Sequence, residues 1–475
     1  MNSNSCKTKI LATLGPQTSS VESIKSLIKA GVNAVRLNMS HGSYDFYSSL
    51  FENIHTARTE LNSSLAILAD LQGPKIRIGE LKEPQIEIFS GNNLEITTED
   101  VLGDENIVST PYKNLQRDAE VGDLILINDG LIRLKIIQKK EDSIVCEIQN
   151  GGILSPRKGM NLPGMRLSTP CLTEKDFDDL NFLIDKPVDY YALSFVRKAE
   201  DIFQLREWLK NKGMTTPIIA KIEKKEAIDA FDTILNAADG IMVARGDLGV
   251  ELSPAKVPVI QKEIIKRCNE TGKLVITATQ MLESMINSPI PTRAEAADVA
   301  NAVWDGSDVV MLSGETSVGK HPIETVKMMH EIVINAEQHF NLNENIKFHV
   351  PEAFEENLFD SVLKGITSVA EQIKANAIVV FTYKGRAARG LAKFRPGAKI
   401  IAISDSFETM NNLCLRWGVN SLFIDKIDKQ HAAIEEAKNL ILNAELVNKG
   451  ELVIFLSRAP FSEKGRSDFL HFEVL

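Results

Sequence analysis

Short apolar runs with the length of β-strands recur along the first part of the chain. Between most of them, apolar side chains return every three or four residues, as at Val21, Ile24 and Ile28, which is the spacing of an amphipathic helix. Near-continuous apolar strands that alternate with helices are typical of a parallel sheet. The eight runs are Thr8–Leu14, Ala34–Ser40, Leu65–Leu71, Tyr190–Val196, Pro217–Glu223, Gly240–Leu248, Leu274–Thr279 and Asp308–Glu315.

The spacing of these runs indicates how the strands are arranged. Their first residues are separated by 26, 31, 125, 27, 23, 34 and 34 residues, and six of these seven intervals fit one strand followed by one helix. Eight such units predict a closed (β/α)₈ barrel, the TIM barrel. A doubly wound open sheet is the alternative, and the series of eight units argues against it.

The interval of 125 residues needs its own explanation. It holds short alternating runs such as Gln85–Phe89, Leu124–Asn128 and Ile144–Ile148, separated by turn residues such as Asp129 and Gly130. We therefore predict a small all-β lid domain, a β-barrel, inserted over residues 74–169 after the third strand. Removing its 96 residues leaves 29, which restores the period of the barrel.

The pattern changes again after His339. The segment Asn341–Val350 is polar and irregular, which is typical of a linker, and Asp360–Lys374 has helical spacing. Strand-like runs then alternate with helical patterns and predict a separate open α/β domain. These runs are Ala377–Thr382, Lys399–Ser404, Val419–Ile424 and Glu451–Ser457. The predicted domains are therefore a barrel of residues 1–73 and 170–340, the inserted domain of 74–169, and a C-terminal domain of 341–475.

Composition narrows the functional classes. The chain has 54 Lys and Arg against 64 Asp and Glu, a formal net charge of −10, and 44% hydrophobic residues, as in a globular protein. This acidic balance argues against nucleic-acid and membrane-surface partners. Five scattered cysteines without a CxxC pair, a polar start and no apolar stretch of membrane-spanning length predict a cytoplasmic protein.

Polar side chains gather where the predicted barrel strands end. Active sites of (β/α)₈ barrels lie at the carboxyl ends of the strands. Each of these side chains alone is more often a solvated charge, and Arg36 with Asp70 could form a structural ion pair. Because six strands contribute, we interpret the set as an active site. It comprises Arg36, Asn38, Ser40, Asp70, Lys221, Glu223, Arg245, Asp247, Thr279, Ser313 and Glu315.

The residue types in this set indicate phosphate chemistry. Glu223 and Asp247 lie on successive predicted strands, and two carboxylates together with substrate oxygens suit Mg²⁺. The absence of a His cluster argues against zinc. Lys221 and Arg36 supply positive charge for a phosphate or a developing oxyanion. Phosphoryl transfer needs such positioning and neutralisation more than a protein nucleophile.

Six motifs closely resemble those of the pyruvate kinase family. The resemblance extends from about Lys9 to the C-terminus and includes the three domains in the family's order. It implies transfer of the phosphoryl group of phosphoenolpyruvate to ADP in glycolysis, giving pyruvate and ATP, by a homotetramer. The motifs are RLNMSHG at 36–42, DLQGPKIR at 70–77, KIE at 221–223, MVARGDLGVE at 242–251, ITATQMLESM at 276–285 and MLSGET at 311–316.

The same resemblance implies a role for each matching residue. Arg36 holds the transferring phosphoryl group, and Lys221 stabilises that group and the enolate. Glu223 and Asp247 hold Mg²⁺, with Mn²⁺ as an alternative, and Thr279 lies where the enolate carbon is protonated. The remaining matches are the backbone of Gly246 and Asp247 for the substrate carboxylate, and Asn38, Ser40, His41, Arg77 and Lys158 for the nucleotide.

One departure from the family concerns its monovalent cation. Many members need K⁺, whose ligands by resemblance would be Asn38, Ser40, Asp70 and the backbone of Leu71. Those members read Asp-Thr-Lys-Gly-Pro-Glu, whereas this chain reads Asp-Leu-Gln-Gly-Pro-Lys and ends the motif with Lys75. An ammonium here can supply the charge of K⁺ and disfavours a nearby cation. We predict activity without K⁺; the alternative is that Lys75 is a surface charge.

The C-terminal domain holds a second candidate site. Thr382, Lys384, Gly385 and Arg386 follow a predicted strand and open a helix, where backbone amides can bind phosphate. In the family, this position resembles an effector site for sugar phosphates or nucleotides; ordinary helix capping is the alternative. The later loop Ser457–Phe469 departs from the family pattern, so the effector and the regulation stay open.

Two rival functions have distinguishable consequences. A metal-dependent lyase or aldolase of phosphoenolpyruvate or pyruvate chemistry could use a similar Mg²⁺–enolate site, but ADP would not affect its turnover. A non-catalytic oligomeric binding protein could keep the fold, but the intact set of Lys221, Glu223 and Asp247 argues against it.

Overall fold

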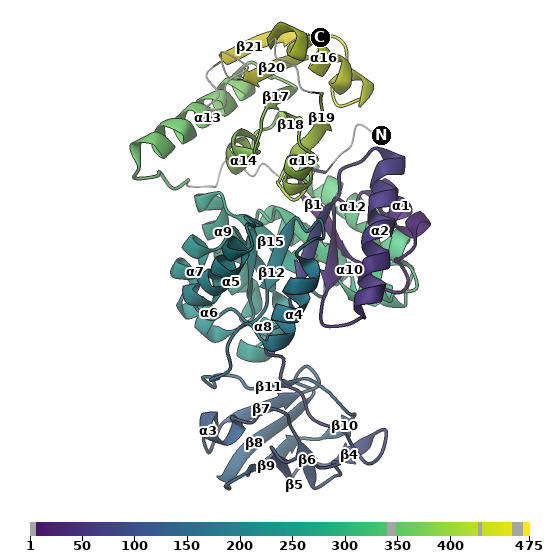
Figure 1. Cartoon of the computed structure of the whole chain (residues 1–475), viewed down its shortest axis with the longest axis vertical. Helices are drawn as coiled ribbons and strands as arrows, with labels where there is room; N and C mark the ends of the chain where they lie inside the picture. Colours follow the sequence, from purple (N-terminus) through teal and green to yellow (C-terminus); the bar gives the residue numbers. More distant parts are fainter. Residues whose placement is uncertain (1–5, 340–347, 426–429, 458–468) are drawn as a thin grey trace.

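The computed structural model describes residues 6–339, 348–425, 430–457 and 469–475, and shows three domains stacked along the long axis of the molecule (Figure 1). The middle domain is a closed barrel in which the strand order is β1-β16-β15-β14-β13-β12-β3-β2, with all neighbours parallel. This confirms the predicted TIM barrel. Its strands are β1 (Lys9–Thr13), β2 (Ala34–Asn38), β3 (Ala66–Asp70), β12 (Tyr190–Leu193), β13 (Ile218–Ile222), β14 (Gly240–Ala244), β15 (Leu274–Ala278) and β16 (Val309–Leu312).

Helices surround the barrel, and local sequence signals fix several of their ends. Ser20 and Ser43 cap the first two helices, Thr173 and Thr292 form capping boxes, and Gly31 ends a helix at a φ of 117°. The helices are α1 (Val21–Ala30), α2 (Tyr44–Leu61), α4 (Glu174–Leu183), α5 (Ala199–Asn211), α6 (Lys225–Asp229), α7 (Phe231–Ala237), α8 (Arg245–Leu252), α9 (Val257–Thr271), η1 (Glu283–Ile286), α10 (Arg293–Trp304), α11 (Gly314–Ser317) and α12 (Pro322–Gln338).

All eight predicted runs extend one to four residues beyond the carboxyl ends of the observed strands, most at β12, β14 and β16. β14 stops at Ala244, so Arg245 and Asp247 lie in the first turn of α8, and β16 stops at Leu312 before α11. Ser40 and Thr279 likewise lie in the turns after β2 and β15. An apolar run that passes from a strand into a buried helix keeps its hydrophobicity, so periodicity alone cannot locate the change.

The inserted domain consists of β-strands and one short helix. Its six-stranded sheet has the order β11-β7-β8-β9-β5-β6, with β11 and β6 at the edges, and β10 pairs with β4 separately. The sequence predicts a β-barrel here, whereas the hydrogen bonding gives these two sheets. The elements are β4 (Ile86–Ile88), β5 (Asn93–Thr97), β6 (Ile107–Ser109), α3 (Leu115–Asp118), β7 (Leu124–Ile127), β8 (Ile132–Lys139), β9 (Ser143–Asn150), β10 (Gly152–Leu154) and β11 (Met160–Asn161).

The C-terminal domain is an open α/β sheet of order β19-β18-β17-β20-β21, as predicted except for its last strand. β21 pairs antiparallel with β20 and alternates half-buried with exposed side chains, as an edge strand does. The elements are α13 (Phe354–Gln372), β17 (Ala377–Phe381), α14 (Arg386–Lys393), β18 (Lys399–Ser404), α15 (Phe407–Leu413), β19 (Val419–Phe423), α16 (Gln430–Asn443), β20 (Leu452–Ser457) and β21 (Phe469–Val474).

The C-terminal domain closes the amino end of the barrel (Figure 1). Leu415 is fully buried in one cluster with the strand residues Leu11, Leu68 and Tyr190. The Lys9 ammonium, buried inside the barrel wall, donates to the carbonyl oxygen of Val419 at 2.8 Å. The core of the barrel is therefore completed by a residue from another domain. Across the described residues, no helix has the length and apolar character needed to span a membrane.

Candidate active site

An ion-pair network joins the carboxyl ends of β2, β3 and β13. The guanidinium of Arg36 lies 2.6 Å from Asp70 and also donates to the Thr13 hydroxyl. Asp70 is buried, and its other oxygen lies 3.2 Å from the Lys221 ammonium. Burial alone would raise the pKa of Asp70, but the charges of Lys221 and Arg36 outweigh it and hold that pKa below its usual range. Asp70 therefore fixes both cations in place.

Lys221 occupies the centre of this network. Its ammonium lies 2.9 Å from Glu223 and donates to the Ser194 hydroxyl at 2.6 Å. Burial acts to lower the pKa of Lys221, and the carboxylates of Asp70 and Glu223 outweigh it, so the pKa is raised. The side chain is 12% exposed and therefore held within the site, not directed to bulk solvent.

Glu223 and Asp247 form a concentration of negative charge beside Lys221. Burial raises the pKa of Glu223, Lys221 opposes this, and the nearby charge of Asp247 raises it further. Among the described residues, no group of three or more His, Cys, Asp and Glu forms a metal site. Two carboxylates fit Mg²⁺, because this ion keeps most of its octahedral positions for water and substrate oxygens.

The first turn of α8 is tied to the turn after β15. The backbone N–H of Gly246 donates to the Thr279 hydroxyl at 2.8 Å. Buried Arg245 donates to the carbonyl oxygens of Thr279 at 2.7 Å and Gln280 at 3.0 Å, and pairs with Asp298 at 2.7 Å. These bonds hold Thr279 and Gln280 at φ values of 66° and 52°, a region that residues other than glycine seldom adopt.

Two of the predicted nucleotide residues, Arg77 and Lys158, line a cavity between the barrel and the inserted domain. This cavity has a volume of about 160 Å³ and is also lined by Lys75 and Asp247. Partial burial lowers the pKa of His41, and the positive charges of Arg77 and Lys75 lower it further. Asn38 accepts a hydrogen bond from the backbone N–H of Ser40 and lies on β2 beside Asp70 of β3.

Two of the candidate K⁺ ligands, Asp70 and the backbone of Leu71, already have partners within the protein. Both oxygens of Asp70 contact cations, and the carbonyl oxygen of Leu71 accepts from the Ser194 hydroxyl at 2.7 Å. Lys75 is exposed and lines the same cavity as Asp247.

The candidate effector residues lie in the C-terminal domain. Thr382 follows β17, Gly385 has a φ of 74° and precedes α14, and Arg386 begins that helix and stacks on the Phe359 ring. The loop Ser457–Phe469 falls largely outside the described residues.

The sequence analysis missed three contributors. Ser194 bonds Lys221 and Asp70, Thr13 bonds Arg36, and the backbone N–H of Phe195 donates to Glu223 at 2.8 Å. Ser194 directly follows β12 and Thr13 ends β1, so the rule that selected the other residues at strand ends would also have found these two. A backbone donor such as Phe195 leaves no signal in the sequence.

A closed (β/α)₈ barrel whose carboxyl end carries paired cations and a carboxylate pair defines a barrel enzyme, and comparisons identify its family. The family "Pyruvate kinase, barrel domain" matches residues 5–326, and "Pyruvate kinase, alpha/beta domain" matches residues 360–472. The chain belongs to the pyruvate kinase family and is a phosphotransferase.

Individual relatives agree with this assignment. The pyruvate kinase of Geobacillus stearothermophilus is 40% identical over 472 residues, which cover 99% of this chain and 80% of that protein. The pyruvate kinase of Staphylococcus aureus strain MRSA252 is 40% identical over 471 residues, with 99% and 80% coverage. A crystal structure of a pyruvate kinase from Cryptosporidium parvum is 35% identical and superposes with a TM-score of 0.92, covering 99% of this chain and 97% of that one.

Proposed function

We propose that this enzyme transfers the phosphoryl group of phosphoenolpyruvate to ADP, giving pyruvate and ATP in glycolysis. The observation that carries the proposal is the buried network of Arg36, Asp70, Lys221 and Glu223 beside Asp247. It supplies fixed positive charge, a carboxylate pair and no activated nucleophile, which are the requirements of phosphoryl transfer. We further propose a cytoplasmic homotetramer.

The side chains would divide the chemistry as follows. Arg36 and Lys221 hold the transferring phosphoryl group, and Lys221 also neutralises the enolate oxygen as charge develops. The N–H groups of Gly246 and Asp247, in the first turn of α8, would bind the substrate carboxylate, and that of Gly246 would exchange its bond to the Thr279 hydroxyl for this one. The Thr279 hydroxyl, fixed by Gly246 and Arg245, lies on the side from which the enolate carbon receives its proton. Glu223 and Asp247 would hold Mg²⁺, or Mn²⁺, which supplies further neutralisation of phosphate and enolate oxygens.

The inserted domain would place the nucleotide and exclude water. Its Lys158, with Arg77 from the connection and His41 from the barrel, offers positive charge to the phosphates of ADP, and Asn38 and Ser40 lie on the barrel side. Closure of this domain over the barrel would remove water that otherwise hydrolyses the transferring group.

The experiment that tests this function is a coupled assay of pyruvate formation from phosphoenolpyruvate. We expect turnover that requires ADP and either Mg²⁺ or Mn²⁺ and produces one ATP for each pyruvate. Pyruvate release at the same rate without ADP would identify a lyase instead, and no turnover under any of these conditions would favour a binding protein.

We also propose that the enzyme works without K⁺. Lys75 lines the cavity that holds Asp247, so its ammonium can provide a fixed charge where relatives bind the ion. We expect at most about a twofold change in kcat when K⁺ replaces a tetraalkylammonium salt at constant ionic strength. Lys75→Glu should create a K⁺ requirement, with Lys82→Glu, an exposed lysine of the inserted domain, as the control. Strong stimulation of the wild type by K⁺ would refute the idea.

A further inference from the structure

A second ion pair lies beside the candidate metal carboxylates. The Lys224 ammonium lies 2.8 Å from Glu251, and the two side chains are only 7% and 1% exposed. Lys224 directly follows Glu223 in the chain, and Glu251 lies on α8. Because both charges of a buried pair lose their hydration, the pair adds little net stability over apolar side chains of the same size. Its presence at this position therefore calls for another explanation.

The positions of this pair repeat those of the metal carboxylates. Glu223 and Lys224 are neighbours in the segment between β13 and α6, while Asp247 and Glu251 are four residues apart on α8 and therefore on one side of that helix. The same two elements thus carry one pair of like charges, Glu223 and Asp247, and one pair of opposite charges. Repulsion within the first pair acts to separate α8 from the segment after β13, and attraction within the second pair opposes that separation.

α8 is also fixed to other parts of the molecule. At its start, Arg245 bonds the turn after β15, as described above. Near its end, the second oxygen of Glu251 accepts a hydrogen bond from the backbone N–H of Gly164, in the inserted domain, at 3.2 Å. Both oxygens of this buried carboxylate are therefore engaged, which fixes the side chain that Lys224 contacts.

The charge of Lys224 would by itself be unfavourable for a nearby cation. Lys224 and Asp247 line the same cavity of about 160 Å³. A positive charge this near to a metal site weakens cation binding by direct repulsion. The contact with Glu251 offers a compensating benefit, because it brings the two elements that bear the metal carboxylates together.

We propose that Lys224 and Glu251 are positioning residues, which hold α8 against the segment after β13 and thereby set the separation of the Glu223 and Asp247 carboxylates for a divalent cation. This inference rests on the proposed function of that carboxylate pair and adds two residues that bind neither the metal nor the substrate. Ligands that are already in place bind a cation more tightly, because the cation does not have to draw two like charges together. Loss of such supporting residues typically lowers metal affinity by about 10- to 100-fold.

Electron paramagnetic resonance of free Mn²⁺, in titrations of the full-length enzyme without substrates, measures this affinity directly. Glu223→Gln should remove most of the binding and so identifies the site. Lys224→Met should weaken binding at least about fivefold, because α8 loses its contact with the segment after β13. A direct electrostatic effect has the opposite sign, since removing a positive charge beside the site would strengthen cation binding.

A charge-neutral double variant separates position from charge. Lys224→Met combined with Glu251→Gln removes one charge of each sign, and the new amide oxygen can still accept the bond from Gly164. No unpaired buried charge remains, so this variant should fold even if Lys224→Met alone does not. We again expect Mn²⁺ binding to weaken at least about fivefold. Lys224→Arg, which keeps a cation opposite Glu251, should bind Mn²⁺ within about twofold of the wild type.

Lys225→Met is the matched control. It removes an ammonium from the next residue, whose partner Asp229 is exposed, and should change the Mn²⁺ affinity less than about twofold. Circular dichroism at the temperature of the titration establishes that each variant is folded. A pair with a purely structural role would lower the thermal midpoint when removed and leave the Mn²⁺ affinity of the folded protein unchanged.

Two results would contradict the proposal in different ways. Mn²⁺ affinity within fivefold of the wild type, or above it, in a folded Lys224→Met or in the double variant would overturn the positioning role and leave the proposed function intact. Failure of the wild type to bind Mn²⁺ in a manner sensitive to Glu223→Gln would refute the metal site itself, and the positioning role with it.

Discussion

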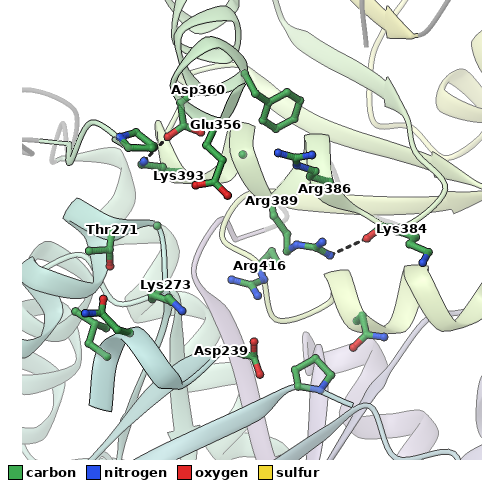
Figure 2. A pocket seen from close by; sticks show the side chains of 18 of the residues that line it. Asp239, Thr271, Lys273, Glu356, Asp360, Lys384, Arg386, Arg389, Lys393 and Arg416 are labelled. Carbon is green, nitrogen blue, oxygen red and sulfur yellow. Dashed lines mark hydrogen bonds and ion pairs between the residues drawn. The ribbon is translucent and has the colours of Figure 1, made fainter. Parts of the chain in front are cut away.

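The two ends of the barrel are both charged and both covered by another domain, yet their charges are arranged differently. At the carboxyl end, Arg36 and Lys221 are held by Asp70 and Glu223 at distances of 2.6 to 3.2 Å. At the amino end, Arg389 and Arg416 line a cavity between the barrel and the C-terminal domain (Figure 2) and have no carboxylate partner among the residues that the structure describes. The first group is therefore a connected network of ion pairs, whereas Arg389 and Arg416 at the amino end stand outside any such network of described residues.

The presence or absence of carboxylate partners determines how firmly the cations of each group are held before any ligand binds. Partners fix the positions of the paired cations before substrate arrives, which is the preorganisation that catalysis requires. Arg389 and Arg416 at the amino end instead repel one another, because no ion pair with a described residue compensates their charges. Substitutions at the carboxyl end should therefore change the rate, and substitutions at the amino end should change stability.

The largest expected effect comes from removing the central cation. Lys221→Met keeps the length of the side chain but removes the ammonium, which leaves Asp70 and Glu223 buried with less compensation. We expect kcat to fall at least about 100-fold, measured by coupled pyruvate detection. Lys225→Met, which removes a surface ammonium paired with Asp229, is the control and should keep kcat. Activity within tenfold of the wild type would mean that the network is structural.

An intermediate effect is expected at the amino end. Leu415→Ala opens a cavity in the cluster that joins the C-terminal domain to the barrel interior. Deleting a buried leucine side chain costs about 2–5 kcal/mol of stability, so the thermal midpoint should fall while kcat at moderate temperature stays near the wild-type value. Leu131→Ala, at a leucine that is 70% exposed, should leave the midpoint unchanged. An unchanged midpoint for Leu415→Ala would show that the contact adds little.

The smallest expected effect is a pH dependence at the same end. Burial raises the pKa of Asp189 to about 7, against the lowering influence of Arg58. In the unfolded chain this carboxyl has its ordinary pKa near 4, so the folded state binds more protons between about pH 4 and 7. Stability should therefore fall as pH rises through this window and then level off.

Scanning calorimetry at several pH values checks this expectation. Asp189→Asn should flatten the decline of the thermal midpoint between pH 5 and 7, and Asp185→Asn, at an exposed neighbour, should not. A wild-type midpoint that rises across this window in parallel with that of Asp189→Asn would contradict the assignment.

Much of the fold could be predicted because the barrel repeats one physical pattern. Each of its strands is buried on both faces, so every unit leaves an apolar run with a regular interval. The last strand, β21, escaped prediction because its polarity does not follow its exposure: the exposed positions are the apolar Leu470, Phe472 and Val474, and the half-buried ones include polar side chains. The true ends of β14 and β16 escaped because the following helices α8 and α11 hold buried side chains as well.

The candidate active site could also be predicted in large part from the sequence. Side chains at strand ends could be selected by position, and the structure gathers Arg36, Asp70, Lys221 and Glu223 into one network. Their roles remain a proposal. The cavity between the barrel and the C-terminal domain could not be found, because its lining residues Lys273 and Arg416 are far apart in the chain and only the docking of two domains brings them together.

The strained turn after β15 has a consequence for engineering. A β-branched residue in the left-handed region carries a cost of order 1–3 kcal/mol, and Arg245 compels Thr279 to remain there. Glycine at that position would relax the backbone and raise the heat resistance of the protein, yet it would delete the hydroxyl that accepts a hydrogen bond from Gly246 and to which we assign a role in proton delivery. Selection for thermal stability alone would therefore favour glycine at this turn, at the expense of the proposed function of Thr279.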